Sequence, residues 1–187
     1  MEDQIIQRAQ QGDSAAFEML IDQHREAMFR YAYLIVRDAH VAEDVTQEAI
    51  WRLYKTLKCV DHTRPFRPWA LHMTGNLARN QNRAWGRYRR MLTHFIASRE
   101  ERLSDVEAST EAQQQAAHLH EAVSRLKGEY QEVIYARFFM GLSVEESAIA
   151  LGIAEGTVKS RAHRALTQLR ALIETQFPQL REAVPHD

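Results

Sequence analysis

The stretch that decides the fold is residues 142–170, which read LSVEESAIALGIAEGTVKSRAHRALTQLR. Ser143 and Glu146 fit the S-x-x-E capping box, in which the serine hydroxyl and the glutamate carboxylate bind free amides at a helix start. Gly152 supplies the positive φ that a tight turn after a short helix requires. A second apolar pattern with helical spacing begins at Thr157. This order of cap, helix, glycine turn and helix predicts a helix-turn-helix.

The two predicted helices bury apolar stripes of different lengths. The first is expected to bury Val144, Ala148, Ile149 and Leu151. The second has a longer apolar stripe, made of Val158, Ala162, Ala165, Leu166, Leu169, Leu172 and Ile173. Other faces of its N-terminal half carry basic and short polar residues, namely Thr157, Lys159, Ser160, Arg161, His163 and Arg164.

Such residues suit a helix that enters a major groove, because cations bind phosphates and short polar side chains reach base edges. The alternative is a basic surface helix in an ordinary bundle. The capping box and the glycine turn, both in register, favour the DNA-binding interpretation.

The composition indicates a globular protein. The chain has 187 residues and 45% hydrophobic content, enough for one sizeable core or two small ones. It has no apolar run of membrane-spanning length, and its first residues lack the basic and apolar blocks of a signal peptide. We therefore expect a cytoplasmic protein without membrane insertion. Cys59 is the only cysteine, which excludes an internal disulfide, and we expect its thiol to be buried.

The net charge of −1 hides an uneven distribution along the chain. Residues 61–90 contain seven arginines and the single acid Asp61, a local balance of about +6 that suits binding to phosphates. The residues before this segment hold ten acids and seven bases. That N-terminal part is expected to face protein.

The helical pattern extends over most of the chain. Asp13 and Asp38 are candidate N-caps of two helices, and Pro65 and Pro68 suit the first turn of a third helix that runs to about Arg90. Two further helices are expected at residues 118–126 and 129–139. The fold class is therefore all-α, with two small helical domains on a tether. The domains are 1–90 and 118–187, and the polar, acidic residues 91–117 form a flexible linker with some helix.

Three stretches resemble one family. DAHVAEDVTQEAIWRLYKTL resembles its D-A-x-D-L-x-Q-E-x-F helix, and PFRPWALHMTGNLARNQNRAWGRYRR resembles its W-L-x-x-I-A-x-N-x-x-x-D-x-x-R segment. Residues 142–165 are similar to its L-S-x-x-E-I-A-x-x-L-G-x-S-x-G-T-V-K-S-R-x-x-R-A signature. The family is the extracytoplasmic-function type of bacterial RNA polymerase sigma factor.

The resemblance implies a specificity subunit of RNA polymerase that is no enzyme and needs no cofactor. It implies binding to the clamp of the largest core subunit and to the flap of the second-largest subunit. It also implies melting of the minus-10 promoter element by the N-terminal domain, and reading of the minus-35 duplex by the C-terminal domain. The linker makes occlusion by an anti-sigma factor feasible.

The motifs assign three sets of contact residues. Core polymerase binding is expected at Asp44, Gln47, Glu48, Trp51 and Arg52. Minus-10 binding is expected at Arg64, Asn76, Arg79, Asn80, Arg83, Arg87 and Tyr88. Minus-35 binding is expected at Thr157, Lys159, Ser160, Arg161, His163 and Arg164.

Some aromatic residues have alternative interpretations. Trp51 could anchor a docking surface, or it could turn inward as core on a solvated acidic helix. The resemblance implies that an unstacked base would be captured near residues 60–66 and on the first turns of the third helix. Trp69 is spaced like a core residue, whereas Trp85 and Tyr88 could stack on bases or pack.

The chain departs from the family pattern at several positions. Ala154 replaces a serine that would cap the recognition helix, a loss of about 1 kcal/mol unless Glu155 or packing compensates. Gly75 inside a helix costs roughly 1 kcal/mol relative to alanine. The remaining departures are His72 and Thr74 in the second motif, and Arg37 and His40 beside the first.

Two other classes of protein share some of these sequence features. A duplex-binding regulator would share the helix-turn-helix but would have no need of the arginine-rich segment. A metalloenzyme would need histidines at ligand spacing, and the nine histidines are scattered, with His118 and His120 diverging on one helix. We therefore expect no metal site.

Overall fold

The computed structural model of the chain describes residues 2–59, 61, 64–93 and 111–183. Side chains are described over the same ranges except at 85–93, 111–113 and 181–183. The regular elements of the described part are all helical, which confirms the predicted fold class. No helix in these ranges combines the length and hydrophobicity needed to cross a bilayer.

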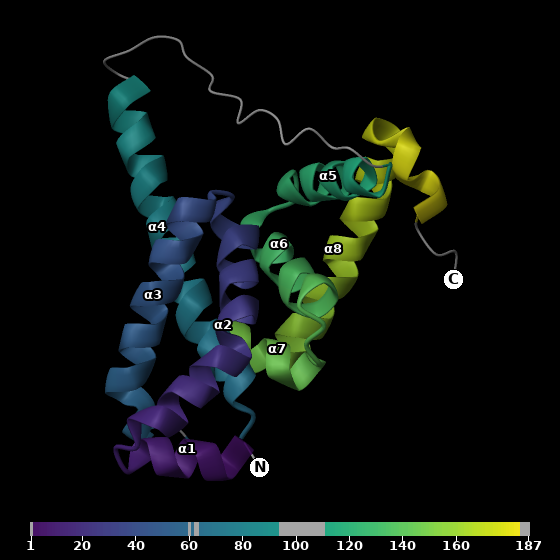
Figure 1. Ribbon diagram of the computed structural model, residues 1–187. Coiled ribbons are helices and arrows are strands. Elements are labelled where there is room, and N and C mark those ends of the chain that lie inside the picture. Colours follow the sequence, from purple (N-terminus) through teal and green to yellow (C-terminus); the bar gives the residue numbers. More distant parts are fainter. Residues whose placement is uncertain (1, 60, 62–63, 94–110, 184–187) are drawn as a thin grey trace.

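The N-terminal half is built from four α-helices and a short 3-10 turn (Figure 1). They are α1 (Glu2–Gln10), α2 (Ser14–Val36), α3 (Ala39–Thr56), η1 (Leu57–Cys59) and α4 (Phe66–Thr93). Both predicted aspartate caps are present: Asp13 accepts from the amide of Ala16, and Asp38 accepts from the amide of Val41. The cap hydrogen bond and the neighbouring Arg8 guanidinium lower the pKa of Asp13.

The C-terminal half contains the predicted helix-turn-helix and the helices that support it. Its elements are α5 (Glu111–Ser124), α6 (Gly128–Ile134), η2 (Tyr135–Phe139), α7 (Val144–Leu151), α8 (Glu155–Gln176) and η3 (Pro178–Ala183). The η2 segment is a π-helix that continues α6. Figure 1 shows this half lying beside the N-terminal bundle, with α7 next to the lower part of α4.

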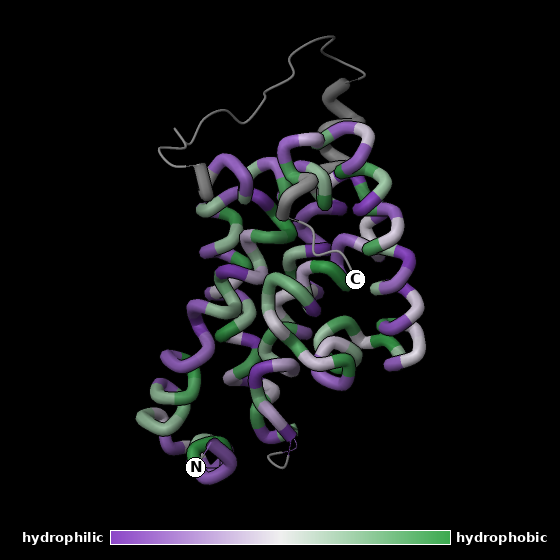
Figure 2. The backbone as a smooth tube through the Cα atoms, turned by 90° about the vertical axis from the view of Figure 1, so that its right-hand side faces the viewer, coloured by the Kyte–Doolittle hydropathy of each residue, from purple (hydrophilic) through white to green (hydrophobic). Residues whose placement is uncertain are grey.

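A single buried cluster runs through both halves. It includes Leu20, Tyr31 and Phe66 from the N-terminal helices, and Val133 and Leu142 from the C-terminal ones, each almost fully buried. Figure 2 shows apolar and polar residues alternating along the helices, the pattern of amphipathic elements that share a core. Two separate domains were predicted from the sequence, but their packing against each other was not.

Several predicted details were wrong. Cys59 is exposed rather than buried, because it ends the η1 turn at the surface. Leu166 is 43% exposed, so the buried stripe of α8 is Val158, Ala165, Leu169 and Ile173. On α7 the most buried residues are Ser147, Ala150 and Leu151, whereas Val144, Ala148 and Ile149 are only half-buried.

Helix boundaries also differ from those predicted. α4 continues to Thr93 and α5 begins at Glu111, so both extend into the predicted linker. Residues 94–110 of that linker lie outside the described residues. The helices α1 and η3 were not predicted as elements; α1 buries Ile5, Ile6 and Ala9 against the bundle.

Candidate functional site

The outer face of α3 carries the residues expected to bind core polymerase. Ala42, Val45, Ala49 and Leu53 occupy the buried face of this helix. The opposite side presents Asp44, Gln47, Glu48, Trp51 and Arg52, all exposed or half-exposed. Helical spacing brings most of these residues onto one continuous surface.

Short polar contacts order this face. Arg52 Nε donates to Glu48 Oε1 at 2.7 Å, and Gln47 Nε2 donates to Glu43 Oε1 at 2.9 Å. Arg25 from α2 reaches the same Glu43 oxygen at 2.8 Å. The hydrogen bond from Gln47, helped by Arg25, lowers the pKa of Glu43, so its carboxylate stays charged.

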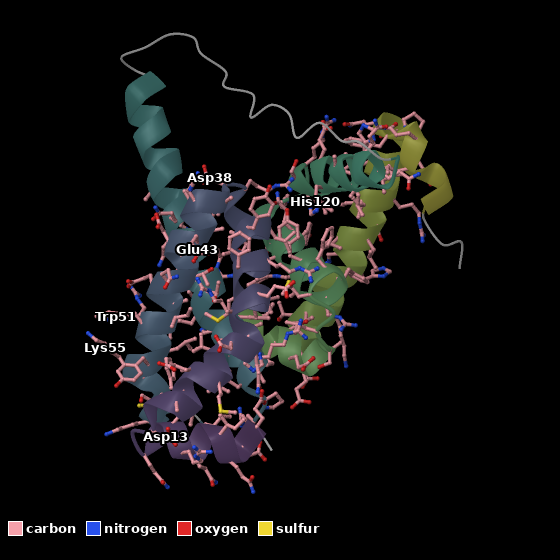
Figure 3. The ribbon with its side chains drawn as sticks, viewed as in Figure 1. Asp13, Asp38, Glu43, Trp51, Lys55 and His120 are labelled. Carbon is pink, nitrogen blue, oxygen red and sulfur yellow. The ribbon has the colours of Figure 1, made fainter. Side chains whose placement is uncertain are left out.

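Trp51 is 53% exposed, so it does not belong to the core. The ammonium of Lys55 lies 3.4 Å from the centroid of its ring, a cation–π contact that fixes the indole. Figure 3 shows both side chains projecting from α3 on the side away from the C-terminal helices.

A second aromatic group on this surface was not predicted from the sequence. Tyr54 is 62% exposed and makes an edge contact with Phe17 of α2, with ring centroids 5.1 Å apart. Tyr54 lies three positions after Trp51 and outside the apolar stripe of α3, and this spacing could have identified it.

The α4 residues expected to bind the minus-10 element fall into two groups. Arg64, Asn80 and Arg83 have exposed side chains, although Arg64 lies 3.3 Å from Asp61 in the loop before the helix. Asn76 and Arg79 are half-buried and bonded to each other, with Arg79 Nη2 donating to Asn76 Oδ1.

Other candidate residues of this segment either belong to the hydrophobic core or have side chains outside the described residues. Phe66 is fully buried and Trp69 packs against it, with ring centroids 5.6 Å apart, so the predicted core role of Trp69 is confirmed. The side chains of Trp85, Arg87 and Tyr88 lie outside the described residues.

Asn76 and Arg79 also connect the two halves of the molecule. Asn76 Nδ2 donates to His72 Nε2 at 2.9 Å, and His72 Nδ1 donates to the carbonyl of Ala150 on α7 at 3.2 Å. Arg79 Nη1 lies 3.5 Å from Glu132 Oε2 on α6.

The helix-turn-helix has the predicted local geometry. Ser143 Oγ accepts from the Glu146 amide at 3.0 Å, and Glu146 Oε2 accepts from the Ser143 amide at 2.7 Å, so both bonds of the capping box form. Gly152 ends α7 at φ +67°. Ala154 precedes α8 without any side-chain cap, and Glu155 in the first turn offers a negative charge to the helix N-terminus.

The N-terminal half of α8 presents an exposed polar face opposite its buried stripe. Lys159, Ser160, His163 and Arg164 are exposed, and Thr157 is half-buried. Arg161 differs from its neighbours because its Nη2 lies 2.9 Å from Glu129 Oε2, and its side chain is only 27% exposed.

The described residues contain no group of three or more histidine, cysteine, aspartate or glutamate side chains arranged to hold a metal ion. His120 packs against the ring of Phe139, and His24 lies 2.8 Å from Glu2. Burial, and then the nearby Arg37, lowers the pKa of His120, which favours its neutral form. The contacts of His120 and His24 are therefore those of packing and ion-pair residues, not of metal ligands.

Comparison with known proteins identifies both halves. Residues 20–88 match sigma-70 region 2, and residues 117–169 match sigma-70 region 4. The chain is 32% identical over 174 residues to the ECF RNA polymerase sigma factor SigL of Mycobacterium tuberculosis, covering 90% of the chain and 95% of SigL. It is 30% identical over 189 residues to the RNA polymerase sigma-H factor of Pseudomonas aeruginosa, covering 96% of each protein.

A longer relative matches as well. The ECF RNA polymerase sigma factor BldN of Streptomyces coelicolor is 32% identical over 173 residues, and the chain covers 65% of its length. The chain belongs to the extracytoplasmic-function family of RNA polymerase sigma factors, within the sigma-70 class. It is therefore a non-catalytic subunit that directs RNA polymerase to promoters, and neither a metalloenzyme nor an ordinary duplex-binding regulator.

Two solved structures share the fold. CnrH in complex with the cytosolic domain of CnrY superimposes with a TM-score of 0.71 at 23% identity, covering 94% of this chain and 98% of that one. RpoE of Bartonella quintana in complex with the anti-sigma factor NepR superimposes with a TM-score of 0.66 at 21% identity, covering 86% of this chain and 98% of that one.

Proposed function

We propose that three surfaces of this sigma factor divide the work of promoter selection. The outer face of α3 binds core polymerase, the exposed side of α4 binds the minus-10 element, and the N-terminal half of α8 reads the minus-35 duplex. The observation that carries the proposal is the exposed face of Lys159, Ser160, His163 and Arg164, which lies opposite the apolar stripe of α8 in a helix-turn-helix whose first helix has a complete capping box.

The α3 surface suits a protein partner better than DNA. It combines carboxylates at Asp44 and Glu48 with the exposed aromatic rings of Trp51 and Tyr54. Aromatic anchors inside a polar rim are typical of interface hot spots, whereas carboxylates repel phosphates. We assign this surface to the clamp of the largest core subunit.

The α4 surface suits an opened strand. Arg64, Asn80 and Arg83 are exposed and supply cations and amides for a backbone and for base edges. Arg87 and Tyr88 belong to the same proposal on the strength of the sequence motif alone.

The domain limits and partners follow from these assignments. We propose that residues 1–90 bind core and the minus-10 element, residues 91–117 link the domains, and residues 118–187 bind the minus-35 element and the flap of the second-largest subunit. CnrH and RpoE were solved with CnrY and with the anti-sigma factor NepR, so an anti-sigma partner is proposed here too. Because its polymerase works in the cytoplasm, we place the protein there.

The test separates core binding from DNA binding. Lys159→Ala and Arg164→Ala should weaken binding to a minus-35 duplex and leave capture of core polymerase unchanged. Asp44→Ala and Gln47→Ala should weaken capture of core polymerase and leave binding to the minus-35 duplex unchanged. Loss of core binding in the α8 variants, or of duplex binding in the α3 variants, would contradict the division of roles.

A further inference from the structure

The start of α8 has few local bonds to stabilise it. Ala154, at the N-cap position, gives the first-turn amides no side-chain hydrogen bond, and Gly156 lies inside that turn. Alanine is a poor N-cap residue, and glycine disfavours a helix because it loses the most backbone freedom on folding. The residues proposed to read the minus-35 duplex begin at Thr157, directly after this weak turn, so contacts with other helices must hold them in place.

Val158 and Arg161 anchor the first two turns of α8 to the rest of the C-terminal half. Val158 is fully buried in the core. Arg161 Nη2 lies 2.9 Å from Glu129 Oε2 in the first turn of α6, a helix that packs beside α8 (Figure 1). An apolar contact has no direction, whereas an ion pair at this distance also fixes where the two groups lie. The pair therefore adds a directional contact near the end of α8 that lacks a cap.

Arg161 lies at the edge of the buried stripe of α8. It is three positions after Val158 and four before Ala165, both fully buried, and residues at these spacings are neighbours on a helix. Its side chain is 27% exposed and faces α6. The polar residues further round the helix are exposed, and we call them the exposed polar face: Lys159, Ser160, His163 and Arg164.

We propose that Arg161 and Glu129 are positioning residues, whose ion pair holds the uncapped start of α8 in place and so presents the exposed polar face to the minus-35 duplex. This inference rests on the proposed minus-35 role of α8. It gives Arg161 a role within the protein, in place of the direct DNA contact expected from the sequence. Both residues belong to the C-terminal half, so the pair does not depend on how the two halves pack.

The charge of Glu129 allows the proposal to be tested by the direction of an effect. Glu129→Gln keeps the size of the side chain and removes a negative charge close to α8. Electrostatics alone would then strengthen DNA binding, because a carboxylate repels phosphates. Loss of the positioning contact weakens DNA binding instead. The two explanations therefore predict changes of opposite sign.

The first experiment measures the affinity of the full chain, bound to core polymerase, for a fluorescent duplex that carries only the minus-35 element of a promoter it transcribes. Glu129→Gln and Arg161→Ala should each weaken binding about two- to fivefold, the range expected of a partly exposed ion pair. The double variant should bind no more weakly than Arg161→Ala, because both substitutions break the same contact. Unchanged or tighter binding by folded Glu129→Gln would overturn the proposal.

The matched control is Glu121→Gln, which removes the same charge from the same half of the molecule. The Glu121 side chain is 51% exposed, close to the 45% of Glu129, and its partner Arg125 lies 2.6 Å away and four residues later in the chain. This control should not weaken binding. A loss equal to that of Glu129→Gln would show a general effect of removing a carboxylate and would contradict the role of the pair. Thermal unfolding of every variant sets a temperature at which all are folded.

The second experiment asks whether Arg161 itself contacts a phosphate. A side chain that neutralises one phosphate adds about 1 to the magnitude of the slope of log affinity against log salt. Lys159→Ala should lower this slope by about 1, whereas Arg161→Ala should weaken binding without changing the slope. An equal fall for Arg161→Ala would make Arg161 a direct contact and refute its positioning role. Wild-type affinity and slope in Lys159→Ala would instead contradict the proposed function, since that substitution leaves the pair intact.

The third experiment supplies the missing cap. Ala154→Ser offers the first-turn amides a hydroxyl acceptor, the bond that the structure lacks. In the Glu129→Gln background it should restore the affinity for the minus-35 duplex to within about twofold of wild type, because the cap and the ion pair order the same helix start. No recovery of affinity in the folded Ala154→Ser/Glu129→Gln chain would overturn the proposal that the pair holds an uncapped helix.

Discussion

At the scale of single residues, Gly75 and Tyr31 show why the second motif departs from its family pattern. Gly75 lies inside α4, where a Cβ atom would come within 2.9 Å of the Tyr31 ring and 3.2 Å of Arg79. Tyr31 is fully buried, so its ring has no room to retreat. The glycine allows α2 and α4 to pack closely.

Gly75→Ala should therefore destabilise the protein, although glycine to alanine in a helix normally stabilises it by up to about 1 kcal/mol. The expected loss is about 1–3 kcal/mol, as for overpacked cores. Gly156→Ala is the matched control, since nothing lies within 4 Å of a Cβ atom on this residue of α8. Denaturant unfolding would check both, and equal stabilisation by the two variants would contradict the packing argument.

Tyr31 also predicts a pH dependence of stability. Burial raises its pKa to about 12, from an ordinary value of 10.0. Because the folded pKa is the higher one, the stabilising contribution is complete below pH 10 and is lost as pH rises toward 12. Wild type should lose roughly 2–3 kcal/mol more than Tyr31→Phe across this window. Parallel pH profiles for the two proteins would contradict this account.

At the scale of elements, α7 and α8 followed their sequence signals closely. The capping box, the left-handed Gly152 and the buried stripe of Val158, Ala165 and Leu169 are local properties, set by short-range bonds and helical spacing. Leu166 was misplaced because helical spacing identifies a stripe but not its width, which depends on neighbouring helices.

Ser143→Ala should remove one bond of the capping box and destabilise the helix-turn-helix by about 1 kcal/mol. The measurement is thermal unfolding of the full chain. Thr175→Ala is a suitable comparison, because the Thr175 hydroxyl is exposed and bonds only to carbonyls of its own helix, those of Ala171 and Leu172, so its removal should have a smaller effect. Equal losses of stability in Ser143→Ala and Thr175→Ala would contradict the stabilising role of the capping box.

The outer face of α3 yields an element-scale prediction about binding. Trp51→Ala should weaken core polymerase binding about tenfold or more, because exposed aromatic anchors dominate interfaces. It should change stability little, since the ring is mostly exposed. Tyr33→Ala removes a comparably exposed aromatic side chain from α2 and serves as the control. Equal affinity of Trp51→Ala and wild type for core polymerase would contradict the proposal that α3 binds core through this residue.

The proposed minus-35 role of α8 can be tested by the salt dependence of DNA binding. Lys159→Ala and Arg164→Ala should each weaken binding to a promoter duplex and reduce the slope of log affinity against log salt by about 1. Arg170→Ala removes the same charge farther along α8, from an exposed position, and should leave the slope nearly unchanged. A uniform effect of all three variants would mean that α8 acts only through its total charge.

At the scale of the whole molecule, the sequence predicted two helical domains but not their association. The contacts that join them run from Arg37, Arg67, His72 and Arg79 to backbone carbonyls and one carboxylate. Any residue can supply a backbone carbonyl, so contacts of this kind cannot be recognised as a motif in the sequence. Arg37, His72 and Gly75 were visible only as departures from the family pattern, and their packing roles emerge from the structure.

The central claim is that this chain, once bound to core polymerase, selects promoters through α4 and α8 together. Transcription in vitro with core polymerase over a promoter library tests it most directly. The account predicts transcripts from a subset of promoters that share minus-10 and minus-35 elements, and loss of that subset in a Lys159→Ala/Arg164→Ala variant that still binds core. Transcripts spread over the library equally with and without the folded wild-type chain would contradict it.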